Sequence, residues 1–147
     1  MVWQTVPLAD FAGNLNPDSV ILSNDLETHL LPREMCATNR RFMAPEQREG
    51  DAPTQEGDMY ALGALLLYLV HEEHPVPFGD VPDDALDQHL EFVRSCRFDC
   101  AWDAAWATGL RGQHGVLESV QRCLGAGEQR PSARAVLETC GTRATQF

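Results

Sequence analysis

A polar turn near the start of the chain holds residue types that occur at catalytic sites. The stretch from Gly13 to Leu22 reads GNLNPDSVIL, so amide, carboxylate and hydroxyl side chains precede three apolar residues. Loops on rigid scaffolds often carry catalytic groups, and a carboxylate such as Asp18 could hold a metal ion. Two interpretations are therefore open at this point: a catalytic loop, or a turn that precedes a strand.

Two further pairs of residues have spacings that suggest metal binding. His71 and His74 lie three residues apart, and Cys96 and Cys100 lie four apart. Zinc sites need three or four converging ligands, so neither pair is sufficient by itself. We interpret the histidines as the solvated end of a helix and the cysteines as buried thiols. No metal ion and no cofactor are expected.

An acidic segment and two tryptophans could instead bind a protein partner. Trp102 and Trp106 lie one helical turn apart, which favours core packing, with a binding hot spot as the alternative. Acidic side chains usually form a solvated surface, but three of them recur here along one side of a predicted helix over residues 83–96, and the group could bind a basic peptide. The acidic residues are Asp80, Asp83, Asp84, Asp87 and Glu91.

The hydrophobic pattern predicts a mainly helical domain around one central helix. Residues 59–71 are apolar on nearly every side, which is typical of a helix at the centre of a fold, and Asp58 is placed to cap its N-terminus. The runs Val20–Leu22 and Thr28–Leu31 predict a small hairpin. Further helices are expected to begin at Pro45 and to cover residues 83–96, 116–124 and 132–140.

Length and charge narrow the classes of function. The 147 residues suggest a single domain over residues 1–147, and the net charge of −11 argues against nucleic acid or an anionic membrane as the partner. The longest apolar run has 12 residues, too few to span a bilayer, and the N-terminus lacks the pattern of a signal peptide. Five cysteines without a CxxC pair favour a reduced, cytoplasmic protein.

Four short motifs, in order and at suitable spacing, resemble the C-terminal lobe of protein kinases. RFMAPE resembles the end of an activation segment, and DMYALG resembles the start of the central kinase helix. The other two motifs are the proline-rich loop before Phe78 and the closing RPS. The motifs are residues 41–46, 58–63, 74–78 and 123–132. The resemblance implies a kinase C-lobe-like fold over residues 14–140, without the N-lobe and the first C-lobe helices.

Under this resemblance the turn of residues 13–22 matches the kinase catalytic loop, but its catalytic residues are replaced by other types. The catalytic base falls on Asn14, the phosphate-contacting lysine on Asn16 and a metal-binding asparagine on Ser19. The metal-binding DFG triplet falls on Pro32, Arg33 and Glu34, whose carboxylate is at the wrong position in the triplet. The resemblance therefore implies a pseudokinase-like chain that is not an enzyme and does not favour ATP binding.

The residues that support the kinase scaffold are retained. Glu46 and Arg130 match a pair that forms a buried salt bridge in kinases, and Asp58 matches the aspartate that binds the catalytic-loop backbone. Loss of one partner of a buried pair costs about 3–5 kcal/mol. The resemblance implies structural roles for these three residues.

Among degenerate kinase lobes, the sequence is similar to the KIND domain of Spir-type actin nucleators. The passages LNPDSVILSND and RPSARAVLETC follow that pattern. Members of this family are interaction modules, and Spir-type members bind a basic peptide of formins, which would suit the acidic chain. The expected function is a cytoplasmic protein-binding scaffold. The alternatives are a fragment of a longer pseudokinase and residual kinase activity, with Asp18, Asp25 or Glu34 as metal ligands.

Overall fold

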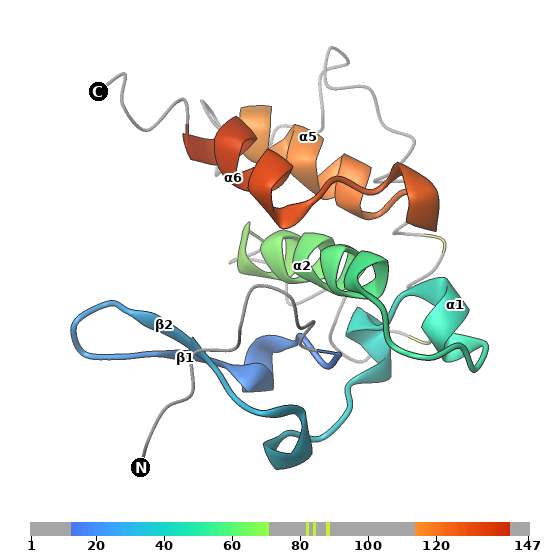
Figure 1. Ribbon diagram of the computed structural model, residues 1–147, viewed down its shortest axis with the longest axis horizontal. Helices are drawn as coiled ribbons and strands as arrows, with labels where there is room; N and C mark the ends of the chain where they lie inside the picture. Colours follow the sequence, from blue (N-terminus) through green and yellow to red (C-terminus); the bar gives the residue numbers. More distant parts are fainter. Residues whose placement is uncertain (1–12, 71–81, 83, 85–87, 89–113, 142–147) are drawn as a thin grey trace.

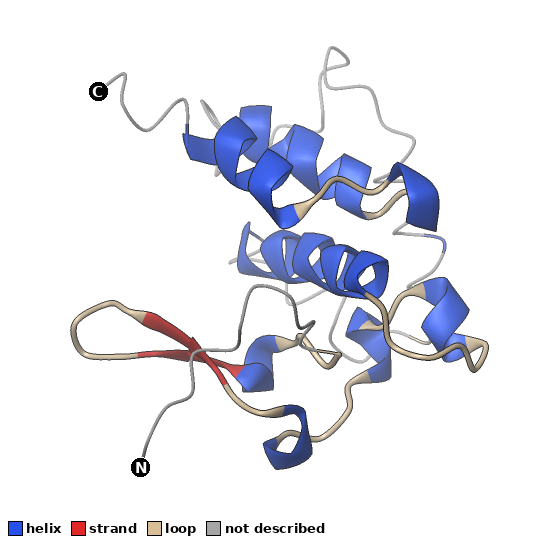
Figure 2. Cartoon of the chain, in the orientation of Figure 1, coloured by secondary structure: helices blue, strands red, loops and turns tan. Residues whose placement is uncertain are grey.

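The computed structural model describes residues 13–70, 82, 84, 88 and 114–141 (Figure 1). Within these residues, helices predominate and the strands form one small hairpin (Figure 2). The α-helices are α1 (Pro45–Arg48), α2 (Gln55–Val70), α5 (His114–Cys123) and α6 (Ala133–Gly141). Short 3₁₀ helices are η1 (Pro17–Ser19), η2 (Arg33–Met35), η3 (Arg40–Phe42) and η4 (Gly127–Gln129). The predicted fold class, mainly helical with a hairpin near the N-terminus, is confirmed.

The hairpin consists of β1 (Val20–Leu22) and β2 (Thr28–Leu30), which pair antiparallel with Ile21 opposite His29. β-Branched and apolar residues on both sides of a polar turn favour this structure. In Figure 1 the hairpin projects away from the helices and lies on the opposite side of α2 from α5 and α6. The predicted hairpin is therefore confirmed, with the second strand one residue shorter than expected.

Helix α2 forms the centre of the described structure, as its all-round apolar sequence predicts. The core lies between α2, η3 and α5, and its buried residues are Phe42, Ala44, Tyr60, Ala64, Leu65, Leu67, Val120 and Leu124. Helices α2 and α5 approach closely at Gly63, where an added Cβ would lie 2.6 Å from the Cβ of Cys123. A second buried cluster joins α2 to α5 and α6 through Met59, Cys123 and Val136.

The start of α2 differs from the sequence prediction. The helix begins at Gln55 rather than Met59, and Thr54 caps it, because the Thr54 Oγ1 accepts a hydrogen bond from the Gly57 N–H at 3.0 Å. The expectation that Asp58 caps this helix is therefore wrong. The apolar pattern begins only at Met59, so it did not reveal the polar first turn.

Other predicted helices fall partly outside the described residues. The helix starts predicted at Pro45 and near Ser132 are confirmed, and the Ser132 hydroxyl accepts a hydrogen bond from the Ala135 N–H at 3.2 Å. Most of the predicted acidic helix over residues 83–96, and both tryptophans of residues 102–106, lie outside the described part of the chain. None of the helices in the described ranges has the length and apolar character needed to cross a bilayer.

Candidate functional site

The candidate site is a polar loop formed by residues 13–19, which ends in η1. The side chain of Asn16 caps η1, because its Oδ1 accepts a hydrogen bond from the Asp18 N–H at 2.9 Å. The Ser19 hydroxyl accepts from the Asn16 N–H and donates to the Asn16 carbonyl oxygen, each at 2.9 Å. Asn16 is 0% exposed and Ser19 is 4% exposed. Both side chains are thus directed into the loop and away from solvent.

Two amide side chains connect the polar loop to the segment that follows η2. The Nδ2 of Asn14 donates to the carbonyl oxygens of Cys36 at 3.2 Å and Ala37 at 3.4 Å. The Nδ2 of Asn16 donates to the Oδ1 of Asn14 at 3.0 Å, which orients the Asn14 amide toward those carbonyls. Because an amide donates where a carboxylate can only accept, this arrangement requires asparagine, and not aspartate, at position 14.

Asp58 connects the polar loop to the central helix. Its Oδ1 accepts a hydrogen bond from the Gly13 N–H at 2.9 Å, across 45 residues of sequence. Asp58 lies in the first turn of α2, where the partial positive charge of the helix N-terminus favours a carboxylate. The rigid helix therefore fixes the position at which the polar loop begins.

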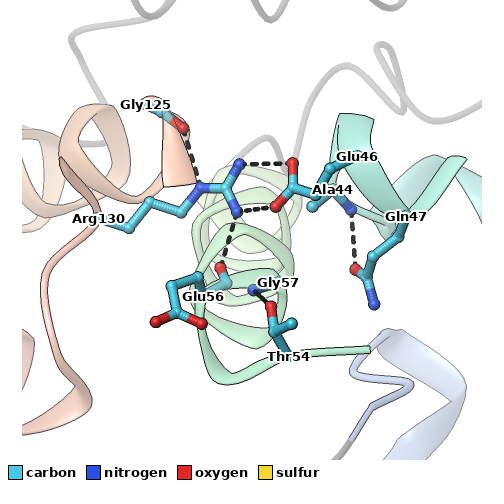
Figure 3. A network of polar contacts seen from close by, with 8 residues as sticks. All are labelled: Ala44, Glu46, Gln47, Thr54, Glu56, Gly57, Gly125 and Arg130. Atoms are coloured by element: carbon cyan, nitrogen blue, oxygen red, sulfur yellow. Dashed lines mark hydrogen bonds and ion pairs between the residues drawn. The ribbon is translucent and has the colours of Figure 1, made fainter. Parts of the chain in front are cut away.

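A second polar network joins α1, α2 and the segment after α5 (Figure 3). The Arg130 guanidinium binds the Glu46 carboxylate with two hydrogen bonds, from Nη1 to Oε1 at 2.5 Å and from Nη2 to Oε2 at 3.0 Å. The planar guanidinium matches both carboxylate oxygens, so the pair is held in one geometry. The two residues are 84 positions apart, and the pair ties two distant parts of the chain together.

Arg130 makes further contacts that use two more of its five N–H donors. Its Nε donates to the Gly125 carbonyl oxygen at 2.9 Å, its Nη1 donates to the Glu56 carbonyl oxygen at 3.0 Å, and its guanidinium lies 5.1 Å from the centre of the Tyr60 ring. The Arg130 side chain is 2% exposed and the Glu46 side chain is 32% exposed. The hydrogen bonds from Arg130 lower the pKa of the Glu46 carboxyl against the opposing effect of burial.

The remaining sequence candidates do not gather into a site within the described residues. Asp18, Asp25, Pro32 and Glu34 are exposed or border solvent, and Pro32 precedes η2. Of the acidic residues assigned to partner binding, Asp84 is exposed, whereas Asp80, Asp83, Asp87 and Glu91 lie outside the described residues. Across the ranges that the structure describes, no three His, Cys, Asp or Glu side chains are grouped to hold a metal ion.

Sequence reasoning missed the capping role of Asn16. The order Asn16-Pro17-Asp18 is a helix-start signature, with asparagine as the N-cap, proline at the first helical position and an acid in the first turn. That signal was available from the sequence. The carbonyl oxygens of Cys36 and Ala37, which accept from Asn14, carry no sequence signal, because every residue has a backbone carbonyl.

Comparison with known proteins gives a distant similarity to a kinase. No protein-family model matches the chain. Among curated proteins, the chain is similar to the leucine-rich repeat receptor-like serine/threonine-protein kinase SKM1 of Arabidopsis thaliana, with 27% identity over 137 residues. The match covers 86% of this chain and 14% of that protein, so the chain spans about one seventh of the relative's length. The match agrees with the kinase-like motifs and does not single out the KIND domain.

Proposed function

We propose that the chain is a non-catalytic interaction module built on a kinase C-lobe-like scaffold. One observation supports this most directly: the side chains that the resemblance aligns with a kinase base, lysine and metal ligand form hydrogen bonds that hold the polar loop together. Asn14, Asn16 and Ser19 donate to or accept from groups of the loop and of residues 36–37. A kinase needs these positions for proton acceptance and charge stabilisation.

The charge chemistry of phosphoryl transfer is also missing from these residues. An asparagine amide cannot accept a substrate proton, and the sequence contains no lysine that could neutralise phosphate oxygens. Ser19 is 4% exposed, and its hydroxyl is committed to the backbone of Asn16, so a metal ion at this hydroxyl would have to break both hydrogen bonds. These features support the absence of kinase activity.

Thermal unfolding with Mg-ATP tests the proposal. A ligand that binds only the folded state raises its stability, by about 2.7 kcal/mol at a hundred times its Kd. We expect no change in Tm at millimolar Mg-ATP and no transfer of labelled phosphate to a generic substrate protein. A rise of several degrees in Tm, or measurable transfer, would overturn the proposal and favour residual kinase activity.

For the partner, we propose a basic segment of a formin-type, cytoskeletal or signalling protein, as the similarity to KIND domains implies. The net charge of −11 and the exposure of Asp84 support this choice. Binding of a labelled arginine-rich peptide should weaken as salt is raised from about 50 to 500 mM, since screening reduces attraction between exposed charges. Absent or salt-independent binding would contradict a basic partner.

A second candidate is a scaffold or allosteric segment of a longer pseudokinase. The match to 14% of a receptor-like kinase supports it, because the similar region there belongs to a larger protein. Coexpression with a kinase N-lobe tests this candidate. If the two parts purify together and the Tm of the chain rises, the pseudokinase segment is favoured over the independent module.

A further inference from the structure

We draw no further inference here: the strongest candidate, the exposed apolar strip of Leu22 and Leu30 on one face of the β1–β2 hairpin, carries none because nothing among the described residues shows what covers it.

Discussion

The Glu46–Arg130 pair and the polar loop of residues 13–19 are both polar networks against the apolar core, and they differ in charge. The pair joins two ionised groups, with Arg130 fully enclosed. The polar loop joins neutral amides and a hydroxyl to backbone groups, and the Asp58 carboxyl accepts a hydrogen bond from its first residue. Removing the enclosed Arg130 leaves the partly buried Glu46 charge without its partner, whereas removing a neutral hydrogen-bonding group leaves only a dipole without one. Single substitutions should therefore lower the free energy of unfolding more in the Glu46–Arg130 pair than in the polar loop.

The largest effect is expected for R130M. The substitution keeps apolar volume but removes the bidentate partner of Glu46 and the donors to Gly125 and Glu56. We expect the free energy of unfolding to fall by about 3 kcal/mol, the lower end for such pairs because Glu46 remains partly solvated. Urea unfolding measures it. R134M is the control, since Arg134 is 89% exposed and should change stability by less than about 0.5 kcal/mol. Equal effects of R130M and R134M would show that the Glu46–Arg130 pair contributes no more to stability than a surface pair.

A smaller loss is expected for N16A. The substitution removes the cap of η1 and the bond to Asn14 at a side chain that is 0% exposed. We expect about 1–2 kcal/mol of lost stability in the same urea experiment, because a cap is worth about 1 kcal/mol and the Asn14 amide loses a part-buried hydrogen bond. N24A, in the exposed turn of the hairpin, is the matched control. If N16A leaves the free energy of unfolding unchanged, the polar loop does not depend on the hydrogen bonds of Asn16.

N14D tests whether position 14 serves chemistry or structure. Aspartate would restore the residue type of a kinase base, but it would place a carboxylate against the carbonyl oxygens of Cys36 and Ala37. We expect stability to fall by about 1–2 kcal/mol, with no response of Tm to Mg-ATP. N24D controls for the added charge. A variant that keeps its stability and gains an ATP-dependent rise in Tm would show that the polar loop retains a catalytic arrangement.

The smallest expected effect is a pH dependence carried by Glu46. Its pKa is lowered in the folded state from the ordinary value of 4.5, so the ion pair stabilises the fold fully above that pH and loses this contribution as pH falls through the folded value. The difference in urea midpoint between wild type and E46Q should therefore shrink between about pH 5 and pH 3. A difference that stays constant over this range would indicate that ionisation of Glu46 contributes nothing.

The sequence predicted local structure better than it predicted contacts between distant segments. The hairpin and the helix at Pro45 follow from short-range patterns, because turn residues and a proline at a helix start act within a few positions. The helix start at Gln55 was missed, since a polar first turn gives no apolar period. The bonds Gly13–Asp58 and Arg130–Glu46 could be anticipated only through the resemblance to kinases, because no local pattern encodes a partner 45 or 84 residues away.

The separation of Glu46 and Arg130 also sets an order in time during synthesis. Arg130 leaves the ribosome 84 residues after Glu46, which at about 5–20 residues per second is a delay of about 4–17 s. During that interval α1 and α2 lack Arg130, the side chain that joins them to the segment after α5. A nascent chain stalled before residue 130 should therefore be more open to protease at α1 than the released protein. Slow or fast codons between Glu46 and Arg130 would lengthen or shorten the time during which α1 is open to protease.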